Sequence, residues 1–380
     1  MSVESMSINK EFEQKLSYEI EQKFLPIFPE GLEIYRSSGW PVEQFYLSHP
    51  SEDFSLRMRE ELKNGELTYE ATLKDTGTVT GAGIARMEVT TPITPELYQL
   101  YRSPDTPILR KVRAEPLPGI TVDYYEDGSV QVESESPANW LEFIRLHGDT
   151  FVEITGDRNS DNEWKAHLSF RRTHSGNETL KPSAELSPHS IVNDILVASR
   201  PDVPTKVHVA GRSGSGKSTI VREIKRELEG LGIDSIVLST DDYHRGNTWL
   251  TQYNDGEPWT KWDDAIVYDT AAMANDLAEL HAGRPIWQRT IDFSVCEPKI
   301  AGVLQPTPVI IIEGIYAKST DISSAERLGY EMTTPLATCV GRLLLRDLRE
   351  RPQFADPAAS LDYILREAEP SYRNQSKVLA

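Results

Sequence analysis

The chain has 380 residues, of which 38% are hydrophobic and 8% aromatic; this is enough for two packed domains and excludes a disordered protein. Its formal net charge of −19 repels nucleic acid and anionic lipid, so a phosphate site must be a local basic pocket. Two cysteines exclude a disulfide framework, the polar start lacks the apolar core of a signal peptide, and no apolar run can span a bilayer. We therefore expect a cytoplasmic protein with no nucleic-acid or membrane partner.

Short stretches of alternating apolar and polar residues, bounded by Gly, Pro, Asp and Asn, predict an antiparallel β domain in the N-terminal half. The predicted strands are Tyr18–Leu25, Phe54–Glu60, Leu67–Lys74, Ala85–Thr91, Ile108–Glu115, Ile120–Tyr125, Val130–Glu135 and Phe151–Thr155. A Pro- and Ser-rich stretch and a short helix at Ile191–Ala198 follow. We therefore place one domain at residues 1–185, a linker at 186–203 and a second domain at 204–380.

Charged side chains recur on one face of nearly every predicted strand, as Glu19, Glu21 and Lys23 do on the first. An open sheet with one wet face is the commoner explanation of such alternation. However, some of the pairs are purely basic, such as Arg57 and Arg59, and others are purely acidic. A closed barrel could use the basic pairs to hold a polyphosphate and the acidic pairs to hold its divalent metal.

The pattern changes at Lys206 to buried strands that alternate with helices, which predicts an α/β domain with a parallel sheet. Strand Val207–Ala210 runs into GRSGSGKS and a helix over Thr219–Leu231, which matches the phosphate loop G-x-x-x-x-G-K-[ST]. Its glycines let backbone N–H groups converge on phosphate oxygens, and Lys217 is expected to reach the β- and γ-phosphates. A flexible Gly/Ser loop is the alternative. The predicted nucleotide-binding residues are Gly211, Ser213, Gly214, Ser215, Gly216, Lys217, Ser218 and Thr219.

Carboxylates follow two apolar strands of this domain. Glu313, at the end of VIIIE, is expected on the Mg²⁺ side together with the Ser218 hydroxyl. Asp241 follows the second strand and can accept the proton of an attacking hydroxyl. The alternatives are an ordinary strand-end acid at Glu313 and a turn residue, which remains plausible for Asp242. Four arginines on one helix can close over phosphate charge or form a solvated face: Arg342, Arg346, Arg349 and Arg351.

The stretch from Val207 to about Tyr372 resembles the uridine kinase and phosphoribulokinase family through GRSGSGKST, STDDYHRG, KWDDAIVYD, TIDF, VIIIEGIYA and RLLLRDLRER, in that order. The resemblance implies that Asp241 is the catalytic base, that Asp263 contacts acceptor hydroxyls and that Glu313 serves the metal. It also implies a lid of arginines over the phosphates: Arg342, Arg346 and Arg351.

The chain departs from this family in its substrate segment. Uridine kinases usually have Tyr-Asp-Phe followed by a His that contacts the base, where this chain has Ile291-Asp292-Phe293 and Cys296. Pyrimidine stacking and its polar partner are both missing. In the lid, Arg351-Pro352-Gln353 replaces Arg-Gly-Arg, and the chain stops about where a last strand of the family would begin. We therefore expect phosphotransfer to a hydroxyl without committing to uridine.

The N-terminal half resembles the CYTH or triphosphate tunnel metalloenzyme family through YEIEQKFL, FSLRMRE, the Lys of ATLKDTG, RMEVTTPI, RKVRAEPL and VDYYEDG. The resemblance implies an eight-stranded tunnel that binds triphosphate compounds with Mg²⁺ or Mn²⁺ and often hydrolyses them. Its metal-side candidates are Glu19, Glu21, Glu133 and Glu135. Its triphosphate-side candidates are Lys23, Arg57, Arg59, Lys74, Lys111 and Arg113. Thr90 stands where a second glutamate often follows Arg-x-Glu, so binding is expected more firmly than hydrolysis.

Three functions fit these features. The first is a two-domain enzyme that transfers the γ-phosphate of ATP or GTP, with Mg²⁺, to a hydroxyl of a nucleoside-like or sugar-like small molecule, while the tunnel hydrolyses or senses a triphosphate. The second is a tunnel-type tri- or pyrophosphatase with a regulatory P-loop domain, which the altered substrate segment favours. The third is a non-catalytic nucleotide sensor, which has no need of a base such as Asp241. A homo-oligomer is compatible with each function.

Overall fold

The computed structural model describes residues 17–104, 106–148, 150–157, 161–173, 186–200, 203–318, 328–350 and 356–378. The chain forms two compact units, Met1–Lys181 with Pro335–Asp362 and Pro182–Thr334 with Tyr363–Ala380. The first unit is built on the predicted β domain and the second on the predicted α/β domain. Residues 335–362, which we predict as part of the second domain, group with the first unit.

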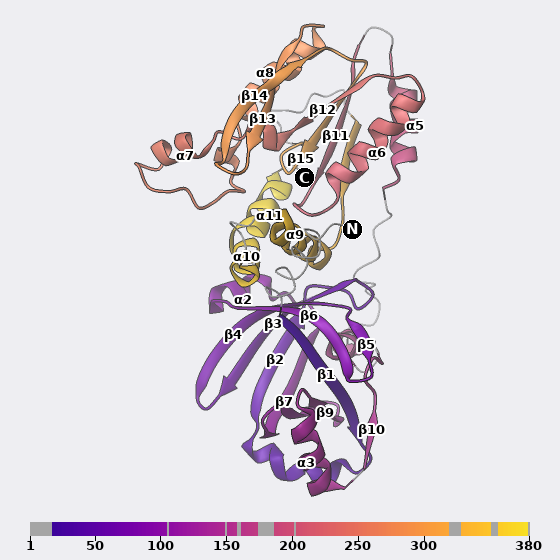
Figure 1. The fold of residues 1–380 in the computed structure, drawn as a ribbon, viewed down its shortest axis with the longest axis vertical. Helices are drawn as coiled ribbons and strands as arrows, with labels where there is room; N and C mark the ends of the chain where they lie inside the picture. The colour runs from indigo at the N-terminus through magenta and orange to yellow at the C-terminus, as the bar shows by residue number, and fades with distance from the viewer. Residues whose placement is uncertain are drawn as a thin grey trace, which may run out of the picture. The chain divides into compact units, whose positions relative to one another are not determined.

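Eight antiparallel strands of the first unit close into a barrel (Figure 1). Their order is β1-β9-β8-β7-β2-β3-β4-β6, and β6 pairs again with β1, where Arg86 lies opposite Glu19. The strands are β1 (Ser17–Pro26), β2 (Trp40–Tyr46), β3 (Phe54–Lys63), β4 (Glu66–Asp75), β6 (Gly83–Pro92), β7 (Ile108–Leu117), β8 (Ile120–Tyr125) and β9 (Val130–Ser134). Inward-facing side chains of a closed ring share one lumen. The predicted eight-stranded antiparallel barrel is confirmed.

The ring contains one strand that was not predicted and lacks one strand that was. β2 completes the ring, whereas the predicted strand Phe151–Thr155 forms the short β10 (Phe151–Glu153), which pairs with β1 beside the ring. β2 lacks a period-two pattern because Gln44 and Phe45 are both fully buried. Gln44 bonds to a lumen arginine, and Phe45 packs under the outer helix α2 (Pro95–Tyr101). A strand covered on both faces cannot be recognised by alternation.

An apolar layer covers part of the outer wall of the barrel. α3 (Pro137–His147) begins after Ser136, whose hydroxyl accepts a backbone N–H of the first turn. Trp140 of α3 stacks on Phe24 of β1 with ring centroids 3.8 Å apart, and η1 (Pro29–Ser38) packs against the same cluster. This outer core leaves the lumen to polar side chains. The unit also contains β5 (Thr78–Thr80), which pairs with β6, and α4 (Asn162–Thr173).

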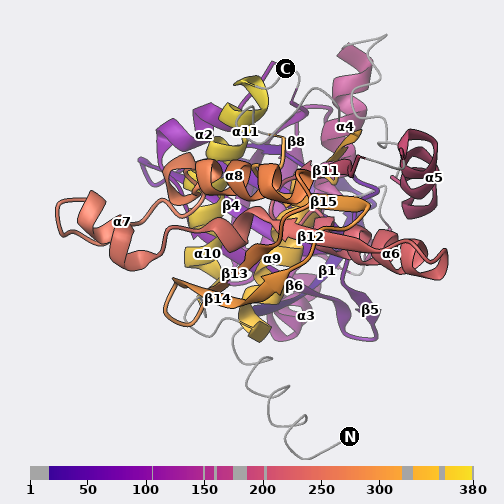
Figure 2. The ribbon, with the colours of Figure 1, turned by 90° about the horizontal axis from the view of Figure 1, so that it is seen from above.

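A parallel sheet in the order β12-β15-β11-β16 forms the centre of the second unit; Figure 2 labels its strands β11, β12 and β15. In β15 (Val309–Gly314), Val309 and Ile311 pack toward α5 and α6, whereas Ile310 and Ile312 pack toward α8. The strand is therefore covered on both faces, which explains its unbroken apolar run and confirms the predicted parallel α/β fold. The other elements are α5 (Pro188–Ala198), β11 (Thr205–Gly211), α6 (Lys217–Gly230), β12 (Ser235–Ser239), α8 (Thr270–His281) and β16 (Leu328–Met332).

The remaining elements lie between and after these strands in the chain. They are η3 (Thr240–Tyr243), α7 (Asn247–Tyr253), η4 (Ala265–Val267), the hairpin β13 (Ile286–Asp292) and β14 (Glu297–Leu304), α9 (Leu336–Glu350), α10 (Pro357–Tyr363), the π-helix η6 (Ile364–Ala368) and α11 (Glu369–Val378). Within the described ranges, no helix has the length and apolar character needed to cross a membrane.

Candidate functional site

The phosphate loop connects β11 to α6. Gly211, Gly214 and Gly216 have φ values of 152°, 76° and 94°, a region that favours glycine. At Gly211 a Cβ atom would lie only 2.8 Å from Cβ of Met332 on β16, so the loop passes close to that strand. α6 begins at Lys217, directly after the loop, and therefore presents the N–H groups of its first turn there. These backbone donors and the helix dipole suit a phosphate chain.

The hydroxyl residues of the loop differ in exposure. Ser213 is half-buried, and Thr219 is exposed on the first turn of α6. The Ser215 hydroxyl is buried and has no hydrogen-bond partner within the described part of the chain. The Ser215 carbonyl accepts a hydrogen bond of 2.8 Å from the Thr334 hydroxyl, which ties the loop to the segment after β16.

Lys217, Ser218 and Glu313 come together where β15 ends beside α6. The Lys217 ammonium donates to the carbonyl of Arg212 at 2.8 Å, and the residue is 9% exposed. The Ser218 hydroxyl donates to Glu313 Oε1 at 3.3 Å. Burial raises the pKa of Glu313, although Lys217 acts in the opposite direction.

This arrangement fits a Mg²⁺ ion. In the described ranges, no three His, Cys, Asp or Glu side chains form a metal site by themselves. However, Mg²⁺ in nucleotide sites is usually held by one or two protein oxygens together with phosphates and water. The Ser218 hydroxyl and the Glu313 carboxylate supply such oxygens.

Asp241 lies at the same edge of the sheet. β12 and β15 are neighbours, with Ser239 opposite Glu313, and Asp241 follows in η3, where its N–H donates to the Ser239 hydroxyl. Burial and the neighbouring Asp241 raise the pKa of Asp242 to about 6, while a hydrogen bond with Thr290 acts against this. Asp242 therefore turns to β13, and Asp241 is the exposed carboxylate of the pair.

Asp263 and Asp241 both affect the same buried tyrosine, Tyr268. Both carboxylates add to the effect of burial in raising the pKa of Tyr268, so both approach this buried tyrosine. The Asp263 carboxylate accepts a hydrogen bond of 2.8 Å from the Tyr363 hydroxyl. Beside it, the Trp262 ring stacks on His244 with centroids 5.8 Å apart and an interplanar angle of 20°. The carboxylates of Asp241 and Asp263 and the rings of His244 and Trp262 thus lie on the same part of the sheet edge, where Asp241 follows β12.

The predicted lid arginines lie on and beyond α9. Arg342 is exposed, and Arg346 pairs with Asp347 at 3.0 Å. Arg351 lies outside the described residues. Their role over the phosphates stays a prediction.

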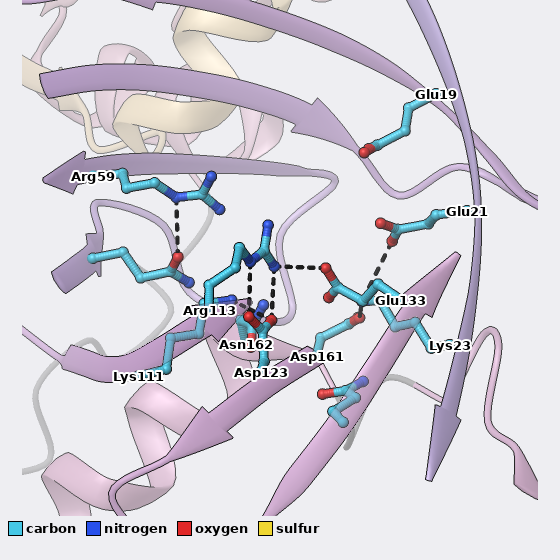
Figure 3. Close-up of polar contacts among 12 residues, drawn as sticks. Glu19, Glu21, Lys23, Arg59, Lys111, Arg113, Asp123, Glu133, Asp161 and Asn162 are labelled. Carbon is cyan, nitrogen blue, oxygen red and sulfur yellow. Dashed lines mark hydrogen bonds and ion pairs between the residues drawn. The ribbon is translucent and has the colours of Figure 1, made fainter. Parts of the chain in front are cut away.

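The barrel encloses a cavity of about 270 Å³ with a charged lining (Figure 3). Nine of the ten predicted tunnel residues line it, namely Glu19, Glu21, Lys23, Arg57, Arg59, Lys74, Arg113, Glu133 and Glu135. Lys111 does not line it and is instead buried against Asp123, with Nζ 2.6 Å from Oδ2. The predicted strand register thus brings the two sets of charges into one lumen.

The lumen carboxylates are held by cations. Arg113 donates two bonds of 2.7 Å to Asp123 and a third of 2.7 Å to Glu133. Glu21 lies 2.5 Å from Arg86 and 3.4 Å from Lys23. The four predicted metal candidates therefore line the cavity without forming a metal cluster of their own in the described ranges.

Two lumen arginines have unused donors, which fits an anionic ligand. The Nε atoms of Arg57 and Arg86 are buried and have no partner among the described residues. Burying a donor without a partner costs free energy, and phosphate oxygens can supply the missing acceptors. Burial raises the pKa of Glu19 to about 7, despite Lys74 at 2.5 Å. The lumen therefore combines donors for an anion with a carboxyl group that titrates near neutral pH.

Several lumen residues have no role in the prediction. Glu70, Arg86 and Glu88 face inward from strands whose motifs carry the resemblance. Tyr46 comes from the unpredicted β2, and the last group precedes or begins α4: Asp161, Asn162 and Glu163. The period-two pattern places Glu70, Arg86 and Glu88 on the charged faces of their strands, but no site role was assigned to them. No strand pattern includes the α4 group, because it reaches the lumen only through tertiary packing.

Comparison with known proteins supports the family of the C-terminal half. Residues 207–373 match the phosphoribulokinase/uridine kinase family. The uridine kinase of Haemophilus ducreyi is 32% identical over 162 residues, which cover 40% of this chain and 72% of that protein.

Two solved structures are also similar. A crystal structure named for a fructose transport system kinase of Silicibacter sp. TM1040 has a TM-score of 0.45 and 19% identity, covering 50% of this chain and 95% of its own. That of the inorganic triphosphatase NE1496 has a TM-score of 0.25 and 21% identity, covering 39% and 93%. The family match and the uridine kinase identity lead to one conclusion: the chain belongs to the phosphoribulokinase/uridine kinase family and carries a small-molecule kinase region in its C-terminal half.

Proposed function

We propose that this kinase region transfers the γ-phosphate of ATP or GTP to a hydroxyl of a nucleoside-like or sugar-like molecule. The observation that carries the proposal is the convergence of Lys217, the Ser218–Glu313 pair and Asp241 at one sheet edge. Asp241 accepts the proton of the acceptor hydroxyl as its oxygen bonds to phosphorus and the bond to the diphosphate breaks. Lys217 stabilises the phosphate charge, and bound Mg²⁺ would add to that stabilisation.

The acceptor class follows from the groups beside Asp241. A carboxylate such as Asp263 accepts hydrogen bonds from hydroxyl groups. The stacked rings of His244 and Trp262 offer a flat surface for a sugar or base. An acceptor with several hydroxyls on a ring fits both features.

We further propose that the barrel binds a triphosphate together with a divalent metal. The paired cations and carboxylates of the lumen and the unused Nε donors of Arg57 and Arg86 support this. Hydrolysis of the triphosphate, with the P-loop region in a regulatory role, is the second candidate function. The carboxylates that line the cavity support it, because they supply oxygen ligands for the divalent metal that hydrolysis would use.

Transfer and release of phosphate from Mg²⁺-ATP and Mg²⁺-tripolyphosphate test both proposals, with a panel of nucleosides and sugars as acceptors. We expect Lys217→Ala to abolish acceptor-dependent transfer only, and Glu21→Gln to abolish phosphate release from tripolyphosphate only. Hydrolysis that survives Lys217→Ala and disappears in Glu21→Gln, with no transfer to any acceptor, would show that the tunnel is the enzyme. Binding of both ligands without any turnover would show a sensor.

Asp161 is expected to compete with the tunnel ligand. Its carboxylate lies 2.7 Å from the ammonium of Lys23, which is nearly inaccessible to solvent. An entering phosphate must take Lys23 from this acid, so Asp161→Asn should raise the affinity for Mg²⁺-tripolyphosphate about fivefold, the equivalent of about 1 kcal/mol. Isothermal titration calorimetry measures the change, and Asp157→Asn, an exposed acid outside the lumen, is the control. A weaker affinity in Asp161→Asn would contradict competition and place Asp161 on the metal side.

A further inference from the structure

Two tyrosines hold Asp263 from different parts of the second unit. The Tyr316 hydroxyl donates to the Asp263 carbonyl at 2.9 Å, and the Tyr363 hydroxyl donates to the carboxylate oxygen Oδ2 at 2.8 Å. Tyr316 is 5% exposed and belongs to a buried cluster with Val267 and Tyr268. The backbone of Asp263 is therefore fixed by the core. Its carboxylate is oriented by the hydrogen bond from Tyr363, which restricts its rotation.

The segment that begins at Tyr363 is also anchored at the phosphate loop. Six residues later, Glu369 is 3% exposed and accepts two hydrogen bonds, of 2.8 and 3.1 Å, from the guanidinium of Arg212. Arg212 is the second residue of the phosphate loop, and its guanidinium lies 4.7 Å from the ring centre of Tyr372. The Tyr372 hydroxyl donates to Glu331 on β16 at 2.7 Å.

One helical segment thus joins the two halves of the reaction site. The π-helix η6 lies between the two anchors, and single π-helical turns occur frequently at functional sites. Neither anchor belongs to the groups that bind phosphate or accept the proton. Tyr363 contacts Asp263, which is proposed to receive the acceptor hydroxyls, and Glu369 contacts Arg212 within the phosphate loop.

We infer that Tyr363 is a positioning residue for the phosphate acceptor. Its hydroxyl holds the Asp263 carboxylate in the orientation that receives the acceptor hydroxyls, and the pairing of Glu369 with Arg212 keeps Tyr363 in place relative to the phosphate loop. This inference rests on the proposed phosphotransfer and deepens it. It assigns acceptor recognition in part to the C-terminal helical segment, which contacts the acceptor site through Asp263.

The test is Tyr363→Phe, which removes one hydroxyl and keeps the ring. We expect the acceptor KM to rise about tenfold, as for the loss of a hydrogen bond to a charged group, with the KM for Mg²⁺-ATP nearly unchanged. Tyr330→Phe is the matched control, because Tyr330 makes the same kind of bond, 2.7 Å to Asp194, away from the site. It should leave both KM values unchanged.

A double-mutant cycle with Asp263→Asn separates positioning from general stability. If Tyr363 acts through Asp263, Tyr363→Phe has no further effect on acceptor binding in the Asp263→Asn background. Acceptor binding is also followed without turnover, by the fluorescence of Trp262 and its neighbours. Should Tyr363→Phe not fold, Glu369→Gln loosens the other anchor and should raise the acceptor KM in the same direction.

An unchanged acceptor KM in Tyr363→Phe would overturn the inference. So would an equal effect of Tyr363→Phe on acceptor binding in the wild-type and Asp263→Asn backgrounds. In both cases the kinase proposal stands. A wild-type protein that transfers phosphate to no acceptor would overturn the proposed function, and the inference with it.

Discussion

Asp241→Asn is expected to lower the rate of phosphotransfer about a thousandfold, within the range found when a positioned general base is removed. The asparagine keeps the size and polarity of the side chain but cannot take the proton of the acceptor hydroxyl. Because the phosphate loop, Lys217 and Glu313 are untouched, the affinity for Mg²⁺-ATP should remain within a few-fold of the wild type. Single-turnover transfer and nucleotide titration measure the two effects separately.

Asp242→Asn is the matched control for this change. Asp242 neighbours Asp241 in the chain, but its side chain forms a hydrogen bond with Thr290 on β13. Its substitution should leave the transfer rate within a few-fold of the wild type. A large loss in Asp242→Asn together with a small one in Asp241→Asn would mean that the base is the other carboxylate.

Arg113→Ala is expected to destabilise the barrel by about 3–5 kcal/mol, the usual cost of removing one partner from a buried ion pair. Asp123 is fully buried and Glu133 nearly so, and Arg113 holds both carboxylates. Burial alone would raise the pKa of each, but Arg113 and Lys111 lower them. Without Arg113, two buried charges remain with fewer partners.

The pKa values also predict how the loss of stability in Arg113→Ala changes with pH. In the wild type, the lowered pKa values of Asp123 and Glu133 contribute stability that is present above their ordinary pKa values and is lost only as pH falls through the lowered ones. In Arg113→Ala the same pKa values should rise, so protonation relieves the buried charge. The variant should therefore lose more stability at pH 8 than at pH 5.

Hydrogen exchange of peptides from β7, β8 and β9, followed by mass spectrometry, reports the opening of this part of the barrel. Arg110→Ala is the control, because Arg110 lies on the same strand but pairs with Glu43 at the surface, and such pairs contribute about 1 kcal/mol or less. Equal losses in the two variants would show that the lumen network is no stronger than a surface pair.

Functional residues within short contiguous motifs could be predicted from the sequence better than the strand pairing that closes the barrel. The phosphate loop is a contiguous motif, so Lys217 and Ser218 could be assigned directly. The lumen residues were assigned through the resemblance to the tunnel family, and a register error of one residue would have reversed every assignment. The resemblance implied the eight-stranded barrel, whereas the alternation of apolar and charged faces alone is more commonly that of an open sheet.

What remained hidden depends on packing. β2 is buried on both faces and has no alternation, and Asp161 reaches Lys23 from a position far along the chain. Lys111 and Arg113 are two residues apart on β7, so alternation predicts that both face the lumen. However, the ammonium of Lys111 pairs with Asp123 and is buried in the barrel wall. Tyr363 and Glu369 show no motif at all, because their partners, Asp263 and Arg212, are more than 90 residues away in the chain.

The lining of the barrel carries its own counter-ions. Among the described residues around the cavity, six basic side chains face eight acidic ones, and several of them are in direct contact. A ligand that enters the cavity must therefore replace existing ion pairs, because the lining has no excess of positive charge. The barrel does not depend on a ligand to keep its charges compensated. An anion and its metal bind only if their contacts with the lining have a lower free energy than the internal ion pairs that they replace. This comparison of free energies sets the selectivity of the barrel.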